Sequence, residues 1–359
     1  MGGRGMGRFR HQSAVVSGAA SHGGEPGSGP ACLDGIQQPD KPARKRACRQ
    51  DCPPHIGAHL FAFFALVCSV AQAQPVFNVD VRLVRLLVTA KDQRGELVGS
   101  LDARDFSIFD CGVTQTISVF ERNTAFPLSV SVLIDTSGST AKDLRYEVTS
   151  VGKFLKTLLG EGNPKDAAAL YSFNDSVTLL STFTRREARL NAALQSIRAD
   201  GGTSFYDAIS LASDGLRDRE GRHVVVVVTD GGDTTSRLKY KEALEAAHRA
   251  EAVLYPILVV PITNDAGRNT GGEHALETLA AGTGGRVFQP SVGAQLDKAF
   301  SDIIRDLRTQ YMIGYYPRNL PADAPAFHPV RVETARTDLR AQTRTGYYGD
   351  QSPKTFNRP

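Results

Sequence analysis

The sequence "SVSVLIDTSGST" runs from Ser129 to Thr140 and is the clearest indication of how this chain folds. It is largely apolar up to Asp135, and two hydroxyl side chains follow at Ser137 and Ser139. A short apolar run of this kind is typical of a strand that is buried on both faces of a parallel sheet. Open parallel sheets bind ligands at the carboxyl ends of their strands, and this stretch ends at such a point.

Further apolar runs of the same kind lie downstream. They are "AAALYSF" (167–173), "HVVVVVTD" (223–230) and "VLYPILVV" (253–260), and longer segments of helical period, such as 142–159, separate them. Strands that alternate with helices predict an α/β domain with a doubly wound, mostly parallel sheet flanked by helices. We assign this domain to residues 127–308.

The segments on both sides of this domain alternate apolar and polar residues with a period of two, which predicts antiparallel strands. Turn signals occur at Arg94-Gly95 and Cys111-Gly112. Either segment alone is too short for a stable sheet. We therefore expect residues 74–126 and 309–350 to form one small β module, in which the two segments pair into one sandwich and Val79 to Phe120 and Gln310 to Tyr348 share a sheet.

The beginning of the chain reads as a leader. Residues 1–55 have no structural periodicity, which indicates a disordered leader or a start assigned too early, and they include the basic stretch "KPARKRACRQ". The apolar run and the small residues over 56–73 predict a signal peptide that is cut after Ala73. The alternative is a short membrane anchor that is retained. We expect an exported, periplasmic or extracellular protein without a membrane span in the mature chain, and a tail over 351–359.

Charge and cysteine content narrow the function further. Residues 1–73 carry eight of the 42 Lys and Arg residues and four of the 38 Asp and Glu residues, so 34 of each sign remain in the rest. A neutral body argues against nucleic-acid binding. Four of the five cysteines lie in the leader, so the mature protein would contain only Cys111. We therefore expect no internal disulfide.

Three strand-end segments carry oxygen-bearing side chains, which are Asp135, Ser137, Ser139, Thr203 and Asp230. We expect them to meet at the carboxyl edge of the sheet. An all-oxygen set suits a hard divalent cation, Mg²⁺ first and Mn²⁺ or Ca²⁺ as alternatives. Because three of the five groups are neutral hydroxyls, the ion would keep enough positive charge to bind an acidic side chain of a protein partner.

This constellation resembles the metal-ion-dependent adhesion site of the von Willebrand factor type A domain, whose pattern is D-x-S-x-S, then Thr, then Asp. The matching segments are "DTSGS", "GGTS" and "TDGG", in that order. The resemblance implies that Ser137 and Ser139 ligate the metal directly and that Thr203 does so directly or through water. It implies that Asp135 and Asp230 act largely through water or hydrogen bonds.

The flanking segments resemble a bacterial secreted subgroup, the VWFA-related proteins. The similarity lies in "GSLDARDFSIFDCGVTQTISVFER" (99–122), "LRTQYMIGYYP" (307–317) and "RTGYY" (344–348). One departure is Cys111, because this subgroup tends to carry an acidic residue there. Together the features predict a non-enzymatic adhesion or scaffolding protein that binds a protein partner through Mg²⁺.

Other functions find less support in the sequence. "IDTSGS" places Ser137 where an aspartic protease needs glycine, and the sequence lacks G-x-S-x-G, H-E-x-x-H and the nucleotide-binding G-x-x-x-x-G-K-[ST]. The remaining alternative is a metal-dependent hydrolase that uses the same cation, with Asp233 as general base. For Asp233 and Ser204 we favour helix capping, and for His223 a place at the entry of a strand.

Overall fold

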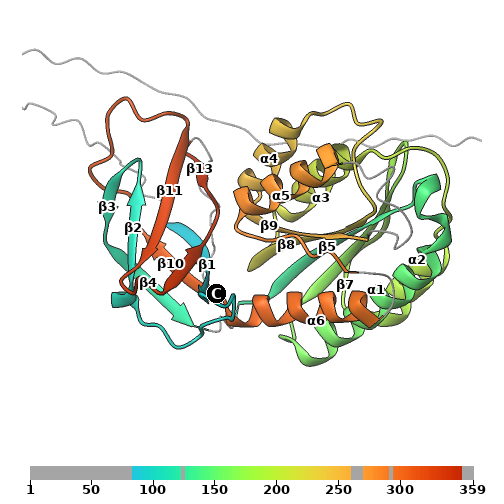
Figure 1. The fold of residues 1–359 in the computed structure, drawn as a ribbon, viewed down its shortest axis with the longest axis horizontal. Coiled ribbons are helices and arrows are strands. Elements are labelled where there is room, and N and C mark those ends of the chain that lie inside the picture. Colours follow the sequence, from blue (N-terminus) through green and yellow to red (C-terminus); the bar gives the residue numbers. More distant parts are fainter. Residues whose placement is uncertain (1–82, 123–125, 260–269, 291–293, 350–359) are drawn as a thin grey trace, which may run out of the picture. The chain divides into compact units, whose positions relative to one another are not determined.

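The computed structural model of the protein describes residues 83–122, 126–259, 270–290 and 294–349. The predicted leader, signal peptide and tail lie outside these ranges. Within them, an α/β domain and a β module contain all the strands (Figure 1). Among the described helices, none combines the length and the apolar character needed to cross a membrane.

The α/β domain is built on a five-stranded sheet with the strand order β7-β6-β5-β8-β9. Four strands are parallel, namely β5 (Leu128–Asp135), β6 (Ala167–Phe173), β8 (Arg222–Thr229) and β9 (Ala252–Leu258). The edge strand β7 (Val177–Thr184) pairs antiparallel with β6. The predicted fold class, a doubly wound and mostly parallel sheet, is confirmed.

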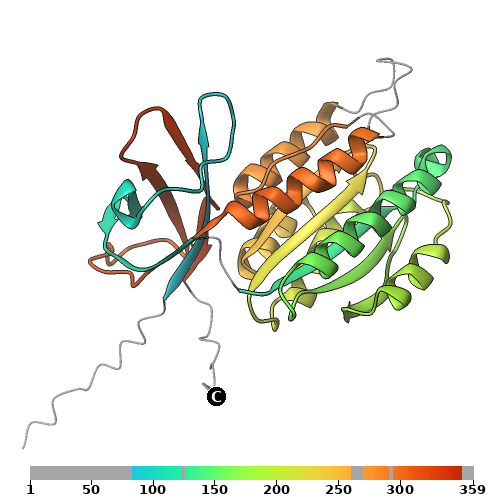
Figure 2. The ribbon, with the colours of Figure 1, turned by 90° about the horizontal axis from the view of Figure 1, so that it is seen from below.

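Helices cover both faces of this sheet (Figures 1 and 2). One face packs against α1 (Leu144–Glu161), α2 (Glu187–Gln195) and α6 (Ala294–Thr309). The other packs against α3 (Phe205–Leu216), α4 (Tyr240–Arg249) and α5 (Thr270–Thr283). Strand β5 alternates between the two cores, because Val132 and Ile134 belong to the first and Leu133 to the second. Burial on both faces explains the continuous apolar runs of the sequence.

The β module consists of two four-stranded antiparallel sheets with the strand orders β12-β1-β10-β4 and β13-β11-β2-β3. The strands before the α/β domain are β1 (Val84–Asp92), β2 (Phe106–Asp110), β3 (Val113–Gln115) and β4 (Ile117–Arg122). Those after it are β10 (Tyr311–Tyr315), β11 (Phe327–Thr334), β12 (Leu339–Gln342) and β13 (Gly346–Tyr348).

The two segments pair into one sandwich, as expected, and they share both of its sheets rather than one, because each sheet contains strands from both segments. Leu86 of β1 pairs with Ile313 of β10, and Ile108 of β2 pairs with Val332 of β11. Each strand has one apolar face, and both sheets direct that face into one common core. A second sheet is therefore what buries the apolar face of the first.

The described part of the fold also contains two short 3-10 helices and a tight hairpin turn. The helices are η1 (Ala103–Asp105) and η2 (Gly138–Lys142). At the predicted turn between β2 and β3, Cys111 and Gly112 have φ angles of 47° and 81°. Positive φ at both positions is what a two-residue hairpin turn of the primed type requires.

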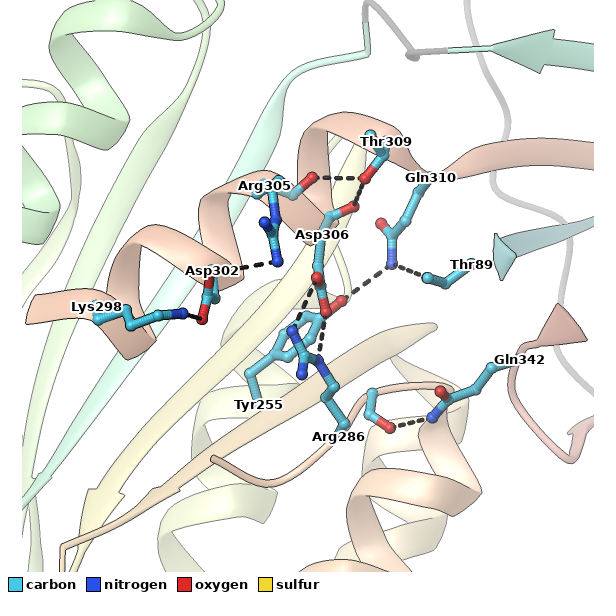
Figure 3. Close-up of polar contacts among 11 residues, drawn as sticks. Thr89, Tyr255, Arg286, Lys298, Asp302, Arg305, Asp306, Thr309, Gln310 and Gln342 are labelled. Carbon is cyan, nitrogen blue, oxygen red and sulfur yellow. Dashed lines mark hydrogen bonds and ion pairs between the residues drawn. The ribbon is translucent and has the colours of Figure 1, made fainter. Parts of the chain in front are cut away.

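Polar contacts join the end of helix α6 to its surroundings (Figure 3). The guanidinium of Arg286 donates two hydrogen bonds to the carboxylate of Asp306, at 2.7 and 3.1 Å. One residue past α6, the amide of Gln310 donates to the hydroxyl of Tyr255 in β9 at 3.1 Å. The helix therefore enters β10 of the β module through buried, hydrogen-bonded side chains.

Candidate functional site

Asp135, the last residue of β5, anchors the candidate site. Its side chain is 0% exposed; Oδ1 accepts a hydrogen bond from the backbone N–H of Ser137 at 2.9 Å, and Oδ2 accepts one from the hydroxyl of Thr229 at 2.6 Å. Burial raises the pKa of Asp135 to about 6 against the lowering effect of these hydrogen bonds, and the negative charge of Asp230 adds to the rise. The carboxylate is thus fixed between the ends of β5 and β8.

Ser137 and Ser139 lie in the loop that follows Asp135, and their hydroxyl oxygens are 3.1 Å apart. Ser137 is buried, whereas Ser139 is exposed. The hydroxyl of Thr140 donates to the backbone carbonyl of Ser137 at 3.0 Å and so holds the turn into η2. The alternation of the sequence therefore brings the two serine hydroxyls side by side, with one open to solvent.

The second predicted segment, the loop before α3, is hydrogen-bonded to the first. The N–H of Gly138 donates to the carbonyl of Gly201 at 3.0 Å, and the N–H of Asp200 donates to the carbonyl of Thr136 at 2.8 Å. Thr203 follows in the same loop and is 6% exposed. The backbone of the Thr203 loop is therefore tied to the loop of Ser137 and Ser139.

Two glycines give the Thr203 loop its shape. Gly201 has φ = 76°, and a Cβ atom on it would lie 2.2 Å from Oδ2 of Asp175. The N–H of Gly202 donates to Oδ1 of the same carboxylate at 2.8 Å. A side chain at position 201 would be strained by the backbone angle and would collide with Asp175, so the "GG" of the motif has a local steric reason.

The third segment begins at Asp230, one residue beyond Thr229 of β8, and Asp230 is half-buried. Its loop joins the second segment, because the N–H of Thr234 donates to the carbonyl of Thr203 at 2.9 Å and the hydroxyl of Thr234 accepts from the N–H of Thr203 at 2.8 Å. All three loops thus meet beyond the ends of β5 and β8. The expectation of three strand ends is wrong for the Thr203 loop, because this loop follows α2 and leads into α3.

Helix capping was expected for Asp233 and Ser204, and the structure confirms it for only one of the two. Asp233 does cap α3, since its Oδ1 accepts from the N–H of Phe205 at 2.8 Å and from that of Tyr206 at 3.4 Å. Ser204 does not: it makes no capping bond with its side chain, and its hydroxyl lies 2.8 Å from that of Thr235. The capping prediction for Ser204 is wrong because Asp233 and Ser236, from another loop, already accept from these N–H groups.

Glu147 of α1 is a residue that the sequence analysis did not single out. It is 1% exposed, and its Oε2 has no hydrogen-bond partner among the described residues. Burial raises the pKa of Glu147 to about 8, and the negative charges of Asp135, Asp230 and Asp143 add to the rise. A signal existed in the sequence, because Glu147 lies three residues after Leu144 and four before Val151 on the apolar stripe of the helix.

This fold and these three loops define a von Willebrand factor type A domain. The sequence agrees, because residues 130–232 match the sequence model of the von Willebrand factor type A domain. The chain therefore contains such a domain. Among curated proteins, none matches the sequence significantly.

Several solved structures are similar to about half of this chain. The conserved hypothetical protein BatB of Bacteroides thetaiotaomicron is 19% identical, with 50% of this chain and 98% of that chain covered and a TM-score of 0.41. The vWF domain of the type V pili tip protein Mfa5 of Porphyromonas gingivalis is 16% identical, with 51% and 95% covered and a TM-score of 0.42. The PilB minor pilin of Streptococcus sanguinis is 15% identical, with 51% and 62% covered and a TM-score of 0.41.

Proposed function

We propose that the protein is an exported adhesion or scaffolding protein whose von Willebrand factor type A domain binds a protein partner through Mg²⁺. The observation that carries the proposal is the 3.1 Å separation of the Ser137 and Ser139 hydroxyl oxygens in the loop anchored by Asp135. Neighbouring oxygens around an octahedral Mg²⁺, at 2.0–2.1 Å from the ion, lie about 2.9 Å apart. The two hydroxyls therefore fit adjacent positions around such an ion, with Mn²⁺ or Ca²⁺ as alternatives.

The surrounding residues support a division of roles. Both carboxylate oxygens of Asp135 already accept hydrogen bonds, which favours an indirect role for Asp135 and direct ligation by the two serines. Thr203 and Asp230, from the two other loops, complete the all-oxygen set. When bound, the ion supplies an electrophilic position for an acidic side chain of the partner. The exposed hydroxyl of Ser139 lies where the partner would approach.

The hydrolase alternative depends on Asp233 as general base. Its Oδ1 accepts hydrogen bonds from two N–H groups of α3, which hold the carboxylate in a structural role. Because this oxygen already caps the start of α3, the structure favours a structural role for Asp233 over that of a proton acceptor. We therefore favour binding over catalysis.

The proposal is tested by capture of partners from the exported proteins of the source cell on the immobilised full chain. Capture is compared with Mg²⁺, with a chelator, and with the variant Ser137→Ala/Ser139→Ala. The matched control is Ser107→Ala/Ser118→Ala, which replaces two exposed serines of the β module. A partner that is retained only with Mg²⁺ and intact site serines supports the proposal. A partner that is retained equally with chelator and by the site variant contradicts the proposal. Turnover of an ester or phosphate that requires Asp233 would favour the hydrolase.

A further inference from the structure

The β module holds a second cluster of metal-ligating side chains, separate from the loops described above. It consists of Asp110 at the end of β2, Cys111 in the following turn and His328 in the neighbouring strand β11. Their potential ligand atoms, an oxygen, a sulfur and a nitrogen, all lie within 4.8 Å of one another.

Asp110 provides the observation that points to a ligand. Its side chain is 0% exposed, and Oδ2 accepts hydrogen bonds from the hydroxyls of Tyr315 at 2.9 Å and Tyr347 at 2.8 Å. Oδ1 has no hydrogen-bond partner among the described residues. A buried carboxylate oxygen without a partner is costly. The two tyrosines orient the carboxylate through Oδ2, in the way that outer-shell groups orient a metal ligand.

His328 lies opposite the free oxygen of Asp110. Its Nδ1 is 3.6 Å from Oδ1, which is too long for a hydrogen bond. Two ligands of a tetrahedral zinc ion, at 2.0–2.1 Å from the metal, are about 3.3 Å apart, so a small movement would admit the ion between them. The ring of His328 lies against that of Tyr347, with centroids 4.8 Å apart.

The hydroxyl of Tyr347 makes metal binding compatible with this network. This hydroxyl donates a hydrogen bond to Asp110 and lies 3.2 Å from Nδ1 of His328. It therefore accepts a hydrogen bond from the histidine. If a metal replaced Tyr347 as the partner of Nδ1, Tyr347 would still donate its hydrogen bond to Asp110. For Nδ1 to bind the metal, the His328 proton moves to Nε2, so the imidazole stays neutral and Nδ1 no longer needs an acceptor.

Cys111 supplies the third donor. Its N–H donates to the carbonyl of Pro329 at 2.9 Å, and its φ of 47° lies in the left-handed region, so the hairpin turn fixes the position of its side chain. Burial and the neighbouring negative charge of Asp110 raise the pKa of the Cys111 thiol. A cation in the cluster would reverse that effect. The half-buried thiol and imidazole leave one side open for an ion to enter.

We propose that Asp110, Cys111 and His328 bind a zinc ion, with a fourth position open to water. Oxygen, nitrogen and thiolate sulfur are all zinc ligands, and the soft thiolate excludes Mg²⁺. As the zinc–sulfur bond forms, the thiol releases its proton to solvent. Two anionic ligands then balance the charge of the ion. The site is independent of the proposed Mg²⁺ site.

Cobalt titration of the full chain tests this site, since tetrahedral Co²⁺ bound to a thiolate gives a sulfur-to-metal charge-transfer absorption that an all-oxygen site cannot give. Every sample carries serine in place of the four leader cysteines, which are Cys32, Cys48, Cys52 and Cys68. The variants are Cys111→Ser and His328→Gln, and the matched control is His274→Gln, an exposed histidine of α5. Thermal unfolding without metal verifies that each variant is folded.

We expect the charge-transfer band in the parent and in His274→Gln, its bleaching by Zn²⁺, and its absence in Cys111→Ser. His328→Gln should weaken zinc binding by more than about tenfold. The proposal is overturned if the parent shows no band, if the band persists in Cys111→Ser, or if His328→Gln binds zinc as the parent does. In those cases Asp110, Cys111 and His328 pack together without forming a zinc site.

Discussion

At the scale of single residues, Asp135 and the serines beside it should differ in what they do for the fold. The carboxylate of Asp135 satisfies the buried N–H of Ser137 and the buried hydroxyl of Thr229, whereas the Ser137 hydroxyl lies 3.1 Å from that of Ser139 and beside the Asp135 carboxylate. Asp135→Ala should therefore lower the free energy of unfolding of the metal-free protein by about 1–3 kcal/mol. Ser137→Ala should change it by less than about 0.5 kcal/mol. Urea unfolding with a chelator measures both, and equal losses would contradict these roles.

Glu147 should make the metal-free protein less stable as pH rises. Its pKa is about 8 in the folded protein against an ordinary 4.5, so between these values the folded state holds a proton that the unfolded state has released. The free energy of unfolding then falls as pH rises through this window. Asp135 acts with the same sign between 3.8 and about 6.

Glu147→Gln has no proton to lose, so its stability should depend less on pH. At about pH 8 it should exceed the parent by up to about 4 kcal/mol, and at about pH 4 the two should be similar. Urea unfolding at a series of pH values, with chelator present, checks this expectation. Parallel pH profiles for parent and variant would show that Glu147 titrates normally.

The candidate site residues could be named from the sequence because three short patterns contain them: two follow apolar runs, and the third, "GGTS", precedes helix α3. Glu147 could not be named in the same way. The helical period places it on the apolar stripe of α1, but its burial depends on the packing of α1 against the sheet. Cys111 and His328 likewise lie 217 positions apart, and only the pairing of β2 with β11 brings them together.

At the scale of elements, the shape of the Thr203 loop should depend on Gly201. Gly201→Ala places a Cβ atom 2.2 Å from Oδ2 of Asp175 at a φ of 76°. We expect it to lower the free energy of unfolding by more than about 1 kcal/mol and to weaken Mg²⁺ binding, because the loop must shift. The control is Gly160→Ala in α1, where a Cβ meets nothing within 4 Å, and which should stabilise the helix by about 0.5–1 kcal/mol. Thermal unfolding and Mg²⁺ titration distinguish the two, and equal effects would argue against a special role for Gly201.

The buried strands of the α/β domain are predictable as elements, because runs such as that of β8 have no polar face. The antiparallel edge strand β7 is harder to predict from the sequence, because Ser181 is its only buried residue. In the β module, a period of two shows that each strand has one apolar face. It does not show which strand covers that face, and this is why the order of the strands in the two sheets could not be predicted.

At the scale of the whole molecule, the chain enters the β module, leaves it for the α/β domain and returns to it. The period-two flanks made this order predictable. The ion pair of Arg286 with the buried Asp306 and the contact of Gln310 with Tyr255 were not predictable, because nothing in the sequence distinguishes these residues from other polar residues of their segments. These contacts decide how α6 leads into β10 (Figure 3).

The central claim is that the von Willebrand factor type A domain binds Mg²⁺ through its serine hydroxyls. Calorimetric titration of the full chain with Mg²⁺ tests it most directly, with Ser137→Ala/Ser139→Ala as the variant and Ser107→Ala/Ser118→Ala as the control. We expect parent and control to bind Mg²⁺, and the site variant to bind more than about tenfold more weakly at an unchanged metal-free melting temperature. If the site variant binds Mg²⁺ as the parent does, the claim fails and "DTSGS" is a structural turn at the end of β5.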